Sequence, residues 1–288
     1  MTIHGPLAAR GQIGRALATA AGGAAFVGAY DAFAASLAHV YEPARRTLTS
    51  YIGDLCRLRR ASDDAELDWG YLANGDLNVA AIAAWAGGNS YVVTVYDQTA
   101  NADHVTQADK TKQPLYVANA RNGHAGMSFQ THRLDGVYTN GGALSQPYDV
   151  FSVAQLDASV VTDVVYRTLA NDNGTNNMLM RKTSGVNVKW QVYTVSGILT
   201  TAGNANANWN VWALRVNGAL SQLRHNAALI GSANLGANVP SGLKLGEQSL
   251  GTNFWYGYIN NFIVCDPGLS DADRAAMETA VNNYWAVY

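Results

Sequence analysis

The amino-acid sequence predicts a mainly β protein, a sandwich of two antiparallel sheets with an N-terminal helical or extended arm and a C-terminal helix. The chain of 288 residues contains 28 glycines and only 14% charged residues, which suits a globular domain with many turns. From residue 90 onward, short apolar and β-branched runs alternate with polar turns. The final segment, 269–288, instead repeats its apolar residues at helical spacing.

The first 28 residues are rich in alanine and glycine, and we expect them to form an attachment arm. Two arginines before an apolar run loosely resemble a secretory signal, but the run is mostly alanine and glycine with little leucine, isoleucine or valine, so we expect the arm to be retained. Ordering such a segment costs roughly 1–2 kcal/mol per backbone residue, which few large side chains can offset, so contacts with another chain are expected. The expected anchors are Ile3, Leu7, Ile13 and Leu17, with Arg10 and Arg15 meeting acidic groups.

The domain division that follows is an arm and short helix over 1–45 and a sandwich domain with its terminal helix over 46–288. The short helix is predicted over 30–41, where apolar residues recur at helical spacing. A second helix is predicted in "DLNVAAIAAWAGG", with Asp76 as its N-cap and Gly87 just past its end.

The clearest strand signal is "NVKWQVYTV", which alternates apolar and polar residues. A strand over 187–195 should bury one face and expose the other; the residues to be buried are Val188, Trp190 and Val192, and those to be exposed are Lys189 and Gln191. A hairpin follows, with Trp212, Leu214 and Val216 on one face and Asn217-Gly218 as its turn.

The C-terminal helix is predicted to begin at Ser270, a good N-cap residue. Asp271 and Asp273 fall in the first turn, where the helix dipole favours acidic residues. One apolar stripe should pack against the sandwich; it consists of Met277, Val281, Tyr284 and Tyr288.

Composition argues against several classes of function. No apolar run reaches about 18 residues, so we expect no membrane span. A net charge of −2 gives no basic surface for nucleic acid. Cys56 and Cys265 are expected to be buried free thiols, or to pair if the first and last strands are neighbours. No metal or cofactor motif occurs, and the acidic run "SDDAELD" is expected to be a solvated turn.

The second half of the chain, roughly 140–288, resembles the laminin-G/concanavalin-like lectin superfamily. The residues that carry the resemblance are the hairpin "WNVWALRVNGALSQLRHNAALIGS" and the later "LGEQSLGTNFWYGYINNFIVCDPGLSDADRAAM". This resemblance implies a concanavalin-like jelly-roll sandwich and a capacity to bind carbohydrate.

The first half resembles the catalytic domain of the α-L-arabinofuranosidase B family. Two motifs carry this resemblance: Arg60, Ser62, Asp63 and Ala65, and the run "YDQT" followed by "VTQA". The same module is similar to segments of phage virion proteins. Asp97, in "YDQT", is expected to fix a loop by accepting backbone hydrogen bonds, with sugar contact as the alternative.

Catalysis in a retaining glycosidase needs two carboxyl groups about 5–5.5 Å apart. The resemblance implies a glutamate nucleophile in the middle of the domain and an aspartate acid/base in a Gly-Gly-Asp turn. Residues 173–246 contain no acidic residue, and the turn "LGEQSLG" offers Glu247, expected to be a solvated or hydrogen-bonding side chain. We therefore predict no catalytic residues and a protein that is not an enzyme.

The function predicted from these observations is that of a non-catalytic virion structural protein with a lectin-like domain. Its expected partners are other virion proteins, bound through the arm, and further copies of itself, with a cell-surface polysaccharide as candidate ligand. The candidate sugar-binding residues are Trp209, Trp255, Tyr256, Glu247 and Asp97. The alternatives are an arabinofuranosidase-like glycoside hydrolase and a secreted carbohydrate-binding or adhesion protein.

Overall fold

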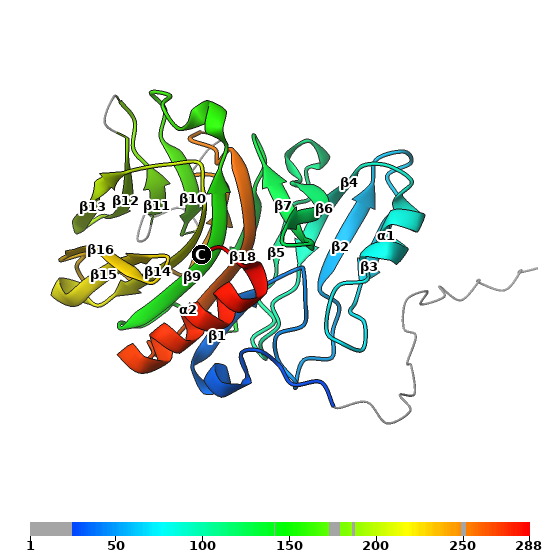
Figure 1. Cartoon of the computed structure of the whole chain (residues 1–288), viewed down its shortest axis with the longest axis horizontal. Helices are drawn as coiled ribbons and strands as arrows, with labels where there is room; N and C mark the ends of the chain where they lie inside the picture. Colours follow the sequence, from blue (N-terminus) through cyan, green and yellow to red (C-terminus); the bar gives the residue numbers. More distant parts are fainter. Residues whose placement is uncertain (1–24, 141, 173–178, 186–187, 249–251) are drawn as a thin grey trace, which may run out of the picture.

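The structure is a computed structural model that describes residues 25–140, 142–172, 179–185, 188–248 and 252–288. The predicted arm anchors, Ile3 to Leu17, lie outside the described residues. The mainly β prediction is confirmed (Figure 1). The strands are β1 (Leu37–Tyr41), β2 (Cys56–Arg60), β3 (Glu66–Trp69), β4 (Ser90–Val95), β5 (Val105–Thr106), β6 (Leu115–Arg121), β7 (His124–Phe129), β8 (Leu134–Val137), β9 (Tyr148–Leu156), β10 (Arg167–Asn171), β11 (Leu179–Lys182), β12 (Lys189–Thr194), β13 (Gly197–Asn204), β14 (Trp209–Val216), β15 (Ser221–His225), β16 (Ala228–Ala233), β17 (Gly242–Leu245) and β18 (Gly257–Cys265). The helices are α1 (Val79–Ala86) and α2 (Asp271–Trp285), with short 3₁₀ turns η1 (Asp31–Ser36), η2 (Lys110–Lys112), η3 (Ala158–Val160) and η4 (Gly218–Leu220).

The strand pairings define two antiparallel layers of a jelly-roll-like sandwich. The front sheet runs β3-β2-β4-β5-β8-β17-β10-β11-β12-β13. The back sheet runs β16-β15-β14-β9-β18, and both β1 and β7 pair with the other edge of β18. The two sheets join where β6, the partner of β7, meets β4 at Leu115 and Tyr91.

The main core lies between the two sheets. Trp190 of β12 packs edge-on against Trp212 of β14, with ring centroids 4.7 Å apart. Val188, Trp190 and Val192 are buried, as predicted for this strand. Lys189 and Gln191 are half-buried rather than exposed, because both side chains form hydrogen bonds to neighbours on β13.

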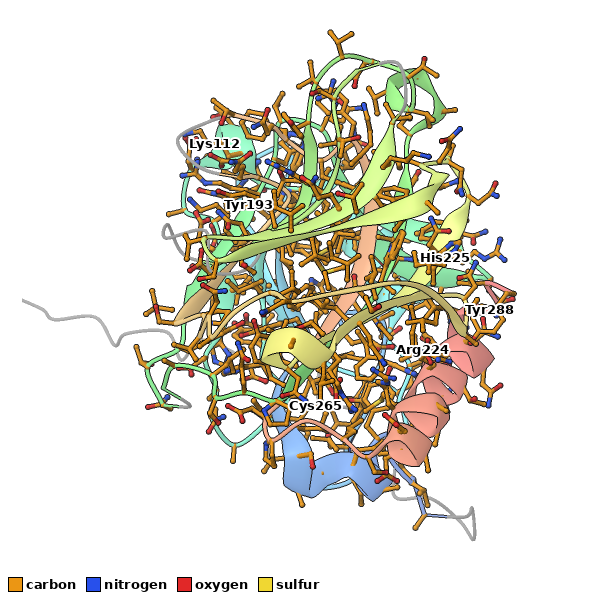
Figure 2. All side chains as sticks on the ribbon, turned by 90° about the vertical axis from the view of Figure 1, so that its left-hand side faces the viewer. Lys112, Tyr193, Arg224, His225, Cys265 and Tyr288 are labelled. Carbon is orange, nitrogen blue, oxygen red and sulfur yellow. The ribbon has the colours of Figure 1, made fainter. Side chains whose placement is uncertain are left out.

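A second apolar cluster lies between the back sheet and α2, so the predicted packing of the terminal helix on the sandwich is confirmed. The Ser270 hydroxyl caps the helix by accepting the Asp273 N–H at 3.1 Å. Figure 2 shows Arg224 beside α2, where its guanidinium contacts buried Glu278 at 2.7 Å. The stripe ends differently from the prediction: Trp285 is fully buried, whereas Tyr288 lies past the helix and is half exposed.

The helix predicted over 30–41 is wrong. The segment forms η1 and then β1, which pairs with β18 from Leu37 opposite Cys265 to Tyr41 opposite Phe262. All five residues of β1 are buried, because the back sheet has core on both faces at this position. A strand buried on both faces loses the apolar–polar alternation, so its sequence does not reveal it.

The second helix is confirmed, with one correction at its start. Asn78, not Asp76, is the N-cap of α1, and its side chain accepts the Ala81 N–H at 3.2 Å. Asp76 instead forms a β-bridge with Arg45. The helix ends at Gly87, whose φ of 58° is the left-handed conformation that glycine adopts without strain.

The hairpin turn and the two cysteines were also predicted from the sequence. The β14–β15 connection is not a two-residue turn at Asn217-Gly218 but includes η4, which begins at Gly218. Cys56 and Cys265 are buried free thiols, and burial raises the pKa of both. Within the described residues, no group of acidic, histidine and cysteine side chains could hold a metal ion. No described helix is long and apolar enough to cross a membrane.

Candidate active site

Asp97 organises the loop after β4. Its buried carboxylate accepts the backbone N–H groups of Val40, Thr99 and Asp103 and contacts Nδ1 of His39 at 3.0 Å. These contacts join β1 to the 97–103 loop, so the loop-fixing role predicted from "YDQT" is confirmed. The contacts place Asp97 in the interior, and its predicted contact with sugar stays untested.

Glu247 lies directly after β17, where Gly246 turns the chain with a φ of +84°. A side chain at Gly246 would collide with the Phe129 ring, so glycine is required on steric grounds as well. The Glu247 side chain is fully buried and contacts Nη1 of Arg133 at 2.6 Å. It is therefore an ion-paired group, not a solvated loop residue.

Arg133 also holds a second carboxylate. Its Nε contacts Oδ2 of Asp135 at 2.9 Å. Asp135 lies on β8, the strand that Arg133 directly precedes and that pairs with β17. Asp135 lies opposite Lys244 of β17 in the strand register, and the Lys244 Nζ is 3.8 Å from Oδ1 of Asp135. Two carboxylates and two cations thus share one face of the front sheet.

The two carboxylates must lie close together, because both contact the same guanidinium. The two contacts and the width of one guanidinium limit the separation of the bound oxygens to about 8 Å. Glycosidases place their two carboxyl groups within about 5–9.5 Å, depending on stereochemistry. The upper limit of about 8 Å therefore places Glu247 and Asp135 near enough to each other to be considered as a carboxyl pair.

Solvent reaches this pair from one side. The Asp135 side chain is 32% exposed and that of Arg133 22%, whereas that of Glu247 is 0% exposed. Burial lowers the pKa of Arg133, but the hydrogen bond to Glu247 and the two carboxylate charges outweigh it, so the pKa is raised. Arg133 therefore stays charged between the two acids.

Amide and aromatic side chains extend this face across the next strands. Asn171 of β10 lies opposite Lys244, and its amide donates to the Gln248 carbonyl beside Glu247. Gln191 of β12 accepts a hydrogen bond from Arg181 at 2.9 Å. The Arg181 guanidinium also lies over the ring of Tyr193, which Figure 2 shows far from α2.

Asp172 stands directly before the span that lacks acidic residues, but it serves the interior. Asp172 is buried. The pKa of Tyr148 is raised first by the burial of Tyr148 and next by the negative charge of Asp172. It also contributes to the raised pKa of Tyr138, another core residue. Its neighbour Asn171 has Lys244 as its strand partner, so successive side chains here serve opposite faces.

The aromatic candidates are not gathered at this pair. Trp255, one of the candidate sugar-binding residues, is fully buried, with its ring centroid 6.1 Å from that of Trp190. Trp209 is half-buried and packs on Tyr258, and Tyr256 lies under the guanidinium of Arg167. Sequence reasoning missed Arg133 and Asp135. The run "RLD" has a charged residue on each side of an apolar one, and in a half-buried strand both charged side chains would lie on the same face.

The described strands thus form a lectin-like, jelly-roll-like β sandwich, and one polar face of it carries the Glu247–Asp135 carboxylate pair. The family model "Alpha-L-arabinofuranosidase B, catalytic" matches residues 28–174, about half of the chain. The chain therefore belongs to this family. No curated protein matches it.

Solved structures agree on the fold. A GH54 α-L-arabinofuranosidase soaked with a cyclic sulfate inhibitor superposes with a TM-score of 0.69 at 16% identity, covering 88% of this chain and 64% of that one. An arabinofuranosidase complexed with arabinofuranosyl-α-1,2-xylobiose gives 0.67 at 15% identity, with the same coverage. The binding domain of Paraclostridial Mosquitocidal Protein 1 gives 0.52 at 11% identity, covering 66% of this chain and 50% of that one. The chain thus spans less than two thirds of these proteins.

The prediction that the protein is not an enzyme is wrong, because the matching family is a catalytic domain. The prediction rested on the absence of acidic residues in 173–246. That span excludes Asp135, which the strand register brings to Glu247 from more than one hundred residues earlier.

Proposed function

We propose that the chain is a glycoside hydrolase that acts on α-L-arabinofuranosyl groups, with Glu247 and Asp135 as its carboxyl pair. The observation that carries the proposal is the sharing of Arg133 by both carboxylates on one face of the front sheet. Family membership supplies the reaction class and the sugar. Hydrolysis by this chemistry needs one carboxylate to attack or stabilise the sugar and one to exchange protons.

The difference in burial between the two carboxylates supports a division of these two roles. Glu247 is fully buried against the Arg133 charge, which suits a carboxylate that must be negative when positive charge develops on the sugar ring. Asp135 is partly exposed, so it can reach the leaving group and exchange protons with water. On the same face, half-buried Gln191 of β12 carries an amide group that can exchange its present partners, Arg181 and Thr200, for sugar hydroxyls.

The test uses the purified chain and chromogenic substrates. We expect release of 4-nitrophenol from 4-nitrophenyl α-L-arabinofuranoside, at least about a hundredfold faster than from the arabinopyranoside or the β-D-xylopyranoside. The comparison separates recognition of the five-membered ring from general glycoside hydrolysis. Absence of release above the uncatalysed rate from all three substrates would overturn the proposal.

The predicted place of the protein in a virion remains a separate proposal, compatible with hydrolysis. It rests on the resemblance to segments of phage virion proteins that the motifs at 60–65 and 96–108 carry in the sequence. The experiment is deletion of residues 1–28, which contain the predicted anchors. The truncated chain should fold with an unchanged circular dichroism spectrum but fail to enter particles; normal assembly would exclude the arm as the anchor.

A further inference from the structure

A depression lies at the β3 end of the front sheet, three strands and more away from the β8–β17 pair that carries Asp135 and precedes Glu247. Figure 1 places α1, β2 and β3 at one end of the molecule and β10 to β13 at the other. Where the α1–β4 connection meets the β2–β3 turn, an open depression of about 490 Å³ is formed. It is lined by Arg60, Ala61, Ser62, Trp85, Ala86, Gly87, Gly88 and Asn89.

The wall of this depression is a braced indole. Trp85 is half-buried, and Trp69 packs edge-on against it with ring centroids 5.5 Å apart. The Arg60 guanidinium lies 5.1 Å from the Trp85 ring centroid and donates to the Trp85 carbonyl at 2.8 Å. Both partners hold the ring in one orientation, so little conformational entropy remains to be lost on binding.

The charge in the depression is already balanced. Asp63 accepts two hydrogen bonds from Arg60, at 2.8 and 2.7 Å, which leaves other N–H groups of the guanidinium to donate. This pairing removes the attraction that a phosphate or carboxylate ligand would need. Neutral hydrogen-bonding groups complete the lining, namely the exposed Ser62 and Asn89.

Glycines keep the floor open. A Cβ atom built on Gly87 or Gly88 would meet no other atom within 4 Å. Close to the indole there is therefore room for a ligand. The volume lies within the range of about 300–1,000 Å³ that small-molecule sites occupy.

We propose that this depression is a second carbohydrate site, which binds a segment of a neutral oligosaccharide or polysaccharide. A sugar ring offers an apolar face to an indole and hydroxyl groups to its surroundings, and the lining supplies both kinds of partner. The proposal stands on this depression and not on hydrolysis at Glu247. It also gives a role to Arg60, Ser62 and Asp63, the motif that the candidate active site leaves unused.

The test is affinity electrophoresis of the full chain carrying Glu247→Gln, so that no polymer is cleaved during the run. Gels contain neutral arabinan, neutral arabinoxylan or anionic polygalacturonate. We expect retardation by a neutral polymer, and an affinity at least about tenfold weaker after Gly88→Phe, because Gly88 lines the depression and a Cβ there meets no other atom within 4 Å, which leaves space for a bulky side chain. Gly203→Phe is the matched control, because its Cβ also meets open space, on β13 at the far end.

The proposal is overturned if neither neutral polymer retards the chain, if only polygalacturonate does, or if Gly88→Phe and Gly203→Phe bind alike. Gly88→Phe in the otherwise wild-type chain should leave hydrolysis of the small furanoside unchanged. Retardation that depends on Gly88, in a chain that hydrolyses no furanoside, would refute the proposed catalysis and support this site.

Discussion

Asp97 and Glu247 are both fully buried carboxylates, but their partners differ. Asp97 accepts hydrogen bonds from three backbone N–H groups and from the Thr99 hydroxyl, all fixed by the fold. Glu247 instead meets the guanidinium of an arginine side chain, Arg133, that a second carboxylate shares. The first arrangement stabilises a loop, and the second brings two carboxylates close together.

Replacing Asp97 with asparagine should destabilise the fold by about 2–4 kcal/mol. The NH2 group of asparagine donates and cannot accept, so where it replaces Oδ2 the Thr99 hydroxyl and the Asp103 N–H lose their acceptor. Urea unfolding of both proteins measures the loss. Asp109→Asn is the control, because that exposed carboxylate contacts only Thr111 and Lys112 of the η2 turn that follows it; equal losses at both positions would contradict the role given to Asp97.

The sequence reveals the role of Asp97 but not that of Asp135. The hydrogen bonds of Asp97 to Thr99 and Asp103 are local, and turn chemistry of this kind is visible in "YDQT". Asp135 can be recognised as a candidate site residue only once it is known to lie near Glu247, and the register of β8 against β17 brings the two together. Register over such a sequence separation is set by tertiary packing, which no local pattern encodes.

Among the elements, α2 is predictable and β1 is not. The terminal helix carries its own cap at Ser270 and a single apolar stripe, so local signals and packing agree. β1 is buried on both faces and follows a 3₁₀ turn, so its apolar residues imitate helical spacing. Strand 187–195 was predictable because only one of its faces enters the core.

Ser270→Ala should lower the free energy of unfolding by about 1 kcal/mol. The substitution removes the oxygen that accepts the Asp273 N–H at the start of α2. Thr279→Ala is a fair comparison, because this exposed residue of the same helix bonds only the preceding turn. A Ser270→Ala protein as stable in urea as the Thr279→Ala protein would show that the cap is dispensable.

At the scale of the whole molecule, the structure carries polar sites on the front sheet and packs α2 against the back sheet. The carboxylate pair lies on β8 and β17, near the middle of the front sheet, while the Trp85 depression lies at its β3 end. One sandwich therefore carries both of the proposed sugar sites, on different parts of the same sheet. The strand order that creates this arrangement could not be predicted from the sequence, whereas the fold class, a sandwich of two antiparallel sheets, could.

Stability should fall as the solution becomes acidic. Burial lowers the pKa of His104, His124, His132 and His225, so the unfolded chain takes up protons first, below about pH 6.5. Asp109, whose hydrogen bonds to Thr111 lower its pKa to about 2, adds a further loss below about pH 4. The urea midpoint should therefore drop from pH 7.5 to pH 5.5 and again below pH 4; a constant midpoint between 7.5 and 5.5 would contradict this account.

The central claim is that Glu247 and Asp135 form a catalytic pair, and kcat/KM for 4-nitrophenyl α-L-arabinofuranoside in the Glu247→Gln protein tests it most directly. The account predicts a fall of about a thousandfold relative to the wild type. Glu278→Gln is the matched control, because Glu278 of α2 is a similarly buried glutamate paired with an arginine, Arg224. The kcat/KM of this control should stay within a few-fold of the wild-type value. A Glu247→Gln protein with the wild-type value, or equal losses in both variants with folding intact, would contradict the claim.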